Sequence, residues 1–218
     1  MRFALVLASA VVLAAFAVAD DRWTVVRSGP FEVWTNGSDK QARLRLLEAE
    51  QFRHAFGYLL GKPDLRTTFP IRIYLMKDKK AARVTNQLRP VRDLLVSNIY
   101  GEDELSPEWR RAMARHLLEA NAKRFAPDVE EGLIEVLAPV EVTGTRITVV
   151  ATDAAHRTPG WAKIHLLTTD PRFAGKLRVY LSNIENGVDD NAASKNAFET
   201  PSAEINRLAA EHIRKSSF

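Results

Sequence analysis

His116 and Glu131 are the two side chains whose type and spacing first suggest a chemistry. Apolar residues recur on one helical face between Ser106 and Arg124, and His116 falls among them, so we expect its imidazole to point inward. Glu131 follows fifteen residues after His116, in a second expected helix that starts at Pro127. Imidazole nitrogen and carboxylate oxygen are both ligands of zinc. A zinc site is therefore the first chemistry to consider.

A catalytic zinc site needs more than two ligands. It uses three protein ligands, an open position for water and a base within hydrogen-bond reach of that water. In a zinc-binding His-Glu-x-x-His helix, the first, second and fifth positions carry these groups. The five positions that end at His116 read Ala112, Met113, Ala114, Arg115 and His116. Ala112 cannot bind metal and Met113 cannot accept a proton, so the sequence predicts no catalytic residue, no cofactor, and weak or absent zinc.

The first half of the chain should supply a sheet and one long helix. Residues 23–27 and 31–35 are β-rich and flank a Ser-Gly-Pro turn, which favours a hairpin. Ser38, with Gln41 three residues later, forms a capping box before a helix that ends at Gly61. Residues 70–76 and 94–100 are further strand candidates. We expect a small, mostly antiparallel sheet here.

The second half should be mainly helical. Four times a good N-cap residue precedes proline, which indicates helix starts at Pro107, Pro159, Pro171 and Pro201. Residues 140–151 are β-rich around Thr143-Gly144 and predict a second hairpin. The last helix should run to about Lys215. The fold class is therefore α+β, with a sheet first and helices afterwards.

Taken in order, these elements resemble the peptidase MA-like, gluzincin-type zinc peptidase domains of exported bacterial proteins. Glu131-Gly132-Leu133 with Glu135 resembles the Glu-Gly-Leu-Ala-Glu element of that family. The resemblance extends over nearly all of the chain, on residues 23–28, 31–33, 42–43, 48, 52–53, 71–75, 161–162, 165, 177–184, 187 and 197–198. It implies a gluzincin core with a degenerate metal site. The implied positions are Ala112, Met113, His116 and Glu131, with Glu135, Arg157 and His165 as additional candidates.

Simpler interpretations stand beside these. A histidine on an apolar face is more often a hydrogen-bonded core residue than a ligand, so we expect His116 to be largely buried and paired with Glu131. Glu131 could equally be a first-turn glutamate that the helix dipole favours. His54, His156 and His212 are expected on the solvent side, whereas His165 is ambiguous. Four arginines could form a patch for an anionic polymer, but a solvated face is more typical: Arg110, Arg111, Arg115 and Arg124.

The N-terminus predicts export. Arg2 is followed by an uncharged apolar run over residues 3–18, and Ala17-Val18-Ala19 forms a small-x-small cleavage site. We expect residues 1–19 to be a signal peptide and residues 20–218 a single domain in the periplasm or outside the cell. A retained membrane anchor is the alternative for this run. No further apolar run is long enough to span a membrane.

Composition excludes several other classes. The 218 residues contain no cysteine, which removes disulfide scaffolds, cysteine-ligated metals and cysteine catalysis. The formal charge of +4 is spread along the chain without a long run of one sign, so nucleic-acid binding has little support.

Three hypotheses follow. The leading one is a catalytically inactive peptidase-like domain that acts as a binding or scaffold module in the cell envelope, with an envelope protein, a peptide or an anionic polymer as partner. The alternative is an active zinc-dependent hydrolase whose site is completed by His156 or His165. The third is a non-enzymatic envelope component that uses its basic helix face against anionic polymers or lipid headgroups.

Overall fold

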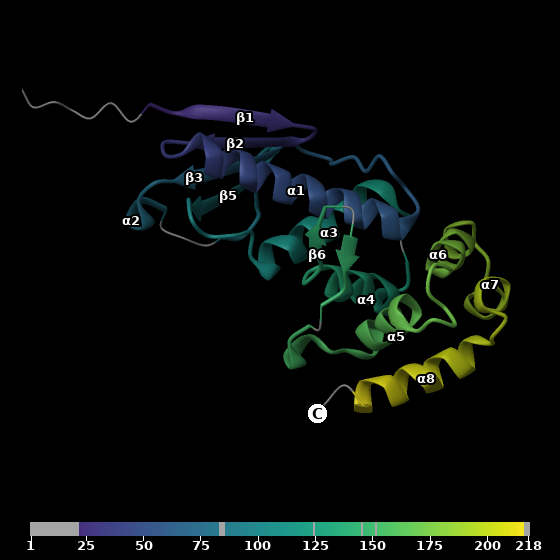
Figure 1. Cartoon of the computed structure of the whole chain (residues 1–218). Coiled ribbons are helices and arrows are strands. Elements are labelled where there is room, and N and C mark those ends of the chain that lie inside the picture. Colours follow the sequence, from purple (N-terminus) through teal and green to yellow (C-terminus); the bar gives the residue numbers. More distant parts are fainter. Residues whose placement is uncertain (1–21, 83–85, 124, 145, 151, 216–218) are drawn as a thin grey trace, which may run out of the picture.

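A computed structural model of the chain describes residues 22–82, 86–123, 125–144, 146–150 and 152–215. The expected signal peptide, residues 1–19, lies outside the described residues. So does Arg124 of the expected basic face. Figure 1 shows a sheet at one end of the molecule and helices at the other, with α8 farthest from the sheet. The α+β class is confirmed.

The sheet has five strands in the order β1-β2-β3-β5-β4. Their bounds are β1 Thr24–Ser28, β2 Phe31–Thr35, β3 Ile71–Met76, β4 Arg89–Val91 and β5 Leu94–Tyr100. The predicted β1–β2 hairpin is confirmed, with Gly29 in the left-handed region at φ 49°. The sheet is mixed, however, because β2–β3 and β3–β5 pair in parallel. The expected predominance of antiparallel pairing is therefore wrong.

The long helix α1, Asp39–Leu60, explains the parallel pairing. It carries the chain from the end of β2 back along the sheet, so β3 starts at the same edge as β2. As the capping box predicts, the Ser38 side chain accepts from the Gln41 backbone N–H at 3.5 Å. The helix ends at Gly61, whose φ of 69° is the left-handed conformation that favours glycine.

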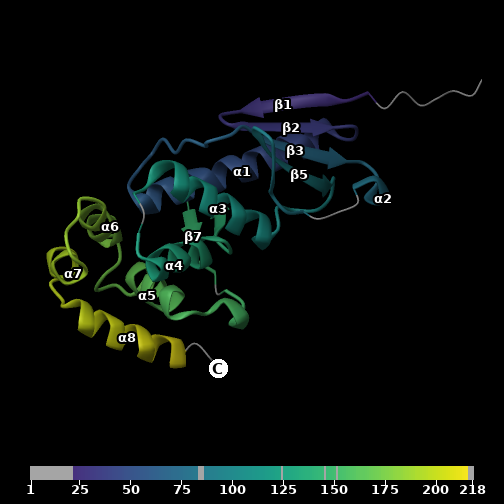
Figure 2. The same cartoon turned by 180° about the vertical axis from the view of Figure 1, so that it is seen from behind.

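The core lies between the sheet and the helices. Alternate residues of the central strands are buried, as period-two patterning requires: Phe31, Val33, Ile71, Ile73, Leu75, Leu95 and Ile99. α1 packs along this face, as Figure 2 shows from behind. The α3 side chain of Trp109 is fully buried and donates its indole N–H to Ser97 of β5 at 3.1 Å. The helix that carries the expected degenerate metal-site positions is thus anchored to the sheet.

The helical half contains more elements than expected. After the short α2, Lys79–Ala82, come α3 Pro107–Asn121, α4 Pro127–Leu137, β6 Glu141–Thr143, β7 Arg146–Thr148, η1 Ala154–His156, α5 Pro159–Thr169, α6 Leu177–Glu185, α7 Asp190–Phe198 and α8 Ser202–Lys215. The helix starts at Pro107 and Pro159 are confirmed, with Ser106 and Thr158 as caps. The start at Pro171 is wrong, because Asp170 instead binds Arg172 and closes a turn before α6.

Two glycines let α4 and α5 cross closely. A Cβ at Gly132 would clash with the backbone of Gly160, and one at Gly160 would clash with Asp128. Gly132 is the glycine of the Glu-Gly-Leu element, so its role here is close helix packing. No helix within the described ranges is long and apolar enough to cross a membrane.

Candidate functional site

The polar centre between α3 and α4 is an ion pair of Arg111 and Glu135. Nε of Arg111 donates to both carboxylate oxygens of Glu135, at 2.9 and 3.2 Å. Glu135 is buried and the Arg111 side chain is only 14% exposed. Nη1 of Arg111 also lies 3.3 Å from the exposed carboxylate of Glu108. The buried carboxylate is therefore paired with a guanidinium that binds both of its oxygens.

His156 is the third member of this cluster. It lies on η1, and its Nδ1 is 3.4 Å from Oε2 of Glu135. Its side chain is 39% exposed, so the solvent-side expectation holds for part of the ring only. Glu135 on α4 and His156 on η1 are separated in the sequence by the β6–β7 hairpin, and the fold brings them into contact. No local sequence pattern predicts this contact, because the position of η1 depends on tertiary contacts.

His116 and Glu131 are not brought together. The His116 side chain is 28% exposed, and its Nδ1 lies 3.4 Å from Glu119 on the same helix. Glu131 is exposed on α4. The predicted burial of His116 and its pairing with Glu131 are therefore wrong. On α4 the inward face runs through Gly132 and Glu135, which places Glu131 on the outside.

The remaining implied positions on α3 are apolar and packed. Met113 is fully buried in the core, and Ala112 is half-buried against it. A base at position 113 would therefore lie in the core. Arg157 donates its Nε to the carbonyl of Thr152 at 3.1 Å, and its guanidinium carbon lies 5.8 Å from the centre of the Trp161 ring.

These donors do not fit a catalytic zinc ion. Across residues 22–215, gaps excepted, no group of three or more histidine and carboxylate side chains is placed to hold a metal. Glu135 and His156 supply two donors, whereas a catalytic site uses three. Both oxygens of Glu135 already accept from Arg111, and a metal there would have to displace a fixed cation.

A second histidine pair lies at the α5–α8 contact. Nδ1 of His165 and Nε2 of His212 are 2.8 Å apart, and the His165 ring lies 4.7 Å from the Trp161 ring. Burial lowers the pKa of His165 to about 4, with smaller contributions from His212 and Arg157. Burial also lowers the pKa of His212, against the opposing effect of Asp170. Both imidazoles are therefore neutral near pH 7, and His212 is half-buried where a solvent-side position was expected.

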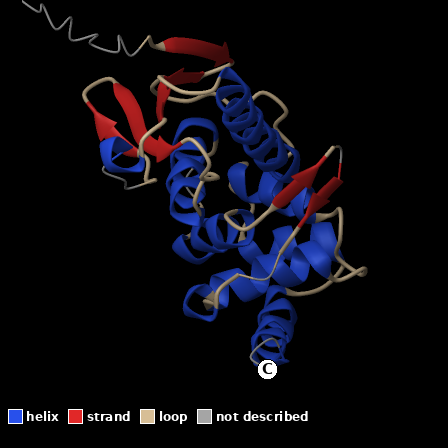
Figure 3. Cartoon of the chain, turned by 60° about the vertical axis from the view of Figure 1, so that its left-hand side comes forward, coloured by secondary structure: helices blue, strands red, loops and turns tan. Residues whose placement is uncertain are grey.

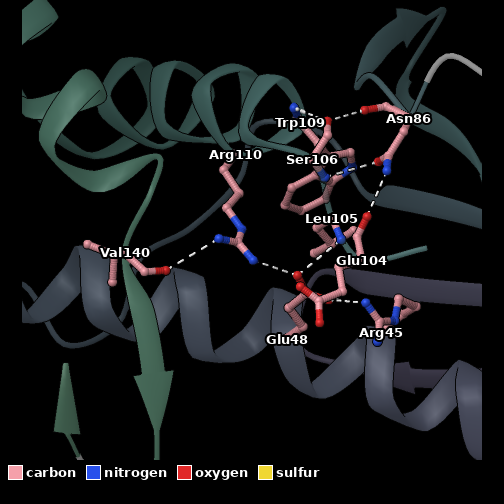
Figure 4. A network of polar contacts seen from close by, with 9 residues as sticks. All are labelled: Arg45, Glu48, Asn86, Glu104, Leu105, Ser106, Trp109, Arg110 and Val140. Atoms are coloured by element: carbon pink, nitrogen blue, oxygen red, sulfur yellow. Dashed lines mark hydrogen bonds and ion pairs between the residues drawn. The ribbon is translucent and has the colours of Figure 1, made fainter. Parts of the chain in front are cut away.

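The arginines considered as a basic patch, for which a solvated face was the expectation, are largely neutralised by ion pairs. Figure 4 shows Arg110 turned toward Glu48 of α1, with Nη2 2.7 Å from Oε1. The same oxygen accepts from the Leu105 N–H at 3.0 Å, and Arg45 binds the other oxygen at 2.5 Å. Arg110 also donates to the carbonyl of Val140 at 3.4 Å. Glu48 thus joins α1 to the start of α3, and Arg110 extends the contact to Val140, just before β6.

With Arg111 also paired, the patch retains one exposed member among the described residues, Arg115.

Comparison of the chain with protein-family models, curated proteins and solved structures finds no match.

Proposed function

We propose that this chain is a binding or scaffold module with a peptidase-like α+β frame, and that it does not hydrolyse peptides. The observation that carries the proposal is the ion pair of Arg111 and Glu135. A zinc hydrolase of the glutamate-ligand type needs a carboxylate free to bind the metal and a base beside the metal-bound water. Here the buried carboxylate is bound by arginine, and position 113 holds a core methionine.

The place of action that we propose is the cell envelope. It rests on the basic residue, apolar run and small-x-small site at the N-terminus. A partner there would be an envelope protein, a peptide or an anionic polymer. N-terminal sequencing of the exported protein tests this part, with Asp20 as the expected first residue and an intact Met1 in the membrane pellet as the opposing result.

An active zinc hydrolase is the second candidate. The contact between His156 Nδ1 and Glu135 Oε2 favours it, because these two groups could become ligands if Arg111 moved away. His165 is less suited, since its Nδ1 is directed to His212.

Peptide cleavage separates the two candidates. Purified protein is incubated with casein and a peptide library, with and without added zinc and with excess chelator. The proposal predicts no cleavage that depends on zinc. Chelator-sensitive cleavage that is lost in Glu135→Gln, and retained in the exposed-site control Glu131→Gln, would establish the hydrolase instead.

A further inference from the structure

A groove runs beside the β6–β7 hairpin, over the C-terminal end of α1. Its volume is about 450 Å³, within the range of ligand-binding sites. One wall is β7 and residues just after it; the other walls are the end of α5 and the start of α6. Figure 3 shows the hairpin as a separate pair of strands beside the helices.

The edge of β7 is available for pairing. The hairpin is a two-stranded sheet, so β7 pairs with β6 along one edge only. Within the described part of the chain, no backbone hydrogen bond reaches its other edge. An unpaired strand edge presents N–H and C=O groups that can accept a further strand.

The side chains around this edge are mainly apolar. The groove is lined by Leu59, Ile147, Val149 and Leu177, and by Tyr58, which is 57% exposed. Three threonines also line it: Thr148 lies on β7, and the hydroxyls of Thr168 and Thr169 donate to carbonyls of their own helix at 2.7 Å. The surface thus offers apolar contacts for alternate side chains of an added strand.

The charged side chains that line the groove are all positive. Its charged lining residues are Arg146 on β7 and Arg178 on α6, and no carboxylate lines it. Both arginines are exposed, and neither forms an ion pair with a described residue. Arg178 stacks over the ring of Tyr58 at 5.4 Å, which holds its guanidinium at the rim. Such a rim attracts carboxylates.

We propose that this groove binds an extended peptide segment of a partner protein, with alternating apolar and acidic side chains, as a third strand on β7. The inference rests on the proposed function, because a peptide held here is bound and not cleaved. The backbone edge would provide the hydrogen bonds, the apolar lining would take alternate side chains, and the two arginines would select acidic neighbours.

A labelled peptide tests the groove. The probe is a fluorescein-labelled heptapeptide of alternating valine and glutamate, followed by fluorescence anisotropy. We expect saturable one-to-one binding, weakened about tenfold or more by the double variant Arg146→Glu with Arg178→Glu. Arg43→Glu is the control, because Arg43 is an exposed arginine near the other end of α1. It should change the affinity by less than about twofold.

Two altered probes test the binding mode. A peptide N-methylated at alternate backbone nitrogens should bind at least about tenfold more weakly, because it lacks strand donors. A valine–lysine peptide should not bind. Hydrogen exchange of residues 146–149 should slow when the valine–glutamate peptide binds.

The outcomes separate this inference from the proposed function. Absence of binding, or binding insensitive to both the arginine reversals and N-methylation, would contradict the proposal that the groove binds a peptide strand. Either result would leave the non-hydrolytic proposal intact. Cleavage of the probe, detected by chromatography, would overturn the proposed function. Stronger binding to phosphatidylglycerol vesicles than to the peptide, lost in the double arginine variant, would assign the groove to lipid and contradict the peptide proposal.

Discussion

Arg111 on α3 binds both carboxylate oxygens of Glu135 on α4 through a single nitrogen, Nε, at 2.9 and 3.2 Å. The two residues join α3 and α4, the helices on which the resemblance implied a degenerate metal site. A guanidinium can hold two helices together as a metal ion would, but it offers no open coordination position and lowers no water pKa. Under the proposed function, this ion pair makes the contact between α3 and α4 a structural junction.

Breaking this pair should destabilise the fold. Arg111→Met leaves the buried Glu135 carboxylate without its arginine and with only His156 nearby, at 3.4 Å. Removal of one member of a buried ion pair costs about 3–5 kcal/mol. The double variant Arg111→Met with Glu135→Leu removes both charges and should recover most of that loss. Urea unfolding of the variants gives the free energies. Equal stability of Arg111→Met and wild type would show that solvent reaches Glu135.

Replacement of Gly132 by alanine should separate α4 from α5. Its Cβ would clash with the backbone of Gly160, which cannot move as a side chain can. We expect a loss of about 1–3 kcal/mol in unfolding free energy, as for overpacked cores. Gly101→Ala is the control, because its Cβ would make only an ordinary contact of 3.5 Å with the carbonyl of Met76. A tolerated Gly132→Ala would place the helices farther apart than described.

Stability should fall as the pH drops from about 6.5 toward 4. The pKa of His165 is lowered from 6.5 to about 4, so below pH 6.5 the unfolded chain takes up a proton that the folded chain excludes. The stabilisation is complete above pH 6.5, and the loss at pH 4 should be roughly 2–3 kcal/mol.

The variant His165→Asn tests the source of this pH dependence. Asparagine keeps a polar atom near the Nδ1 position and does not titrate, so the slope between pH 6.5 and 4 should flatten. His54→Asn, at an exposed site, should leave the slope unchanged. A slope that persists in His165→Asn would assign the titration to other groups.

His116 should contribute little to stability, in contrast with its helix neighbour Met113. His116 is partly exposed and lies near a carboxylate that is 62% exposed, so His116→Ala should cost at most about 1 kcal/mol. Met113 is fully buried, and Met113→Ala should cost about 2–5 kcal/mol. Thermal and denaturant unfolding compare the two. A larger loss for His116→Ala would restore the buried position that the helical pattern predicted.

Local signals predicted much of the fold. Three helix starts were identified from their cap residues, Ser38, Ser106 and Thr158. A buried strand was identified from the alternation of Ile71, Ile73 and Leu75. Parallel pairing was missed because the direction of β3 depends on the crossover by α1, which lies outside either strand's own pattern. The false start at Pro171 arose because an Asp-Pro pair serves turns as well as helix caps.

The site was less predictable. Helical spacing placed His116 among the apolar residues of one face, but a small rotation of α3 decides whether a residue on such a face is buried. Glu135 was proposed only through the family resemblance, although its alignment with Gly132 on one face marks it as inward. The contacts of Glu135 with Arg111 and His156 join separate elements, so they depend on tertiary structure.

Zinc affinity is the most direct test of the central claim that Arg111 excludes a metal from this junction. The purified chain, freed of metal with chelator and dialysed, is titrated with zinc in competition with a chromophoric chelator. Arg111→Ala and the exposed-site control Arg115→Ala are titrated in parallel. We expect no stoichiometric zinc site of submicromolar Kd in the wild type or in the control. One tightly bound zinc per wild-type chain, lost in both Glu135→Gln and His156→Gln, would contradict it.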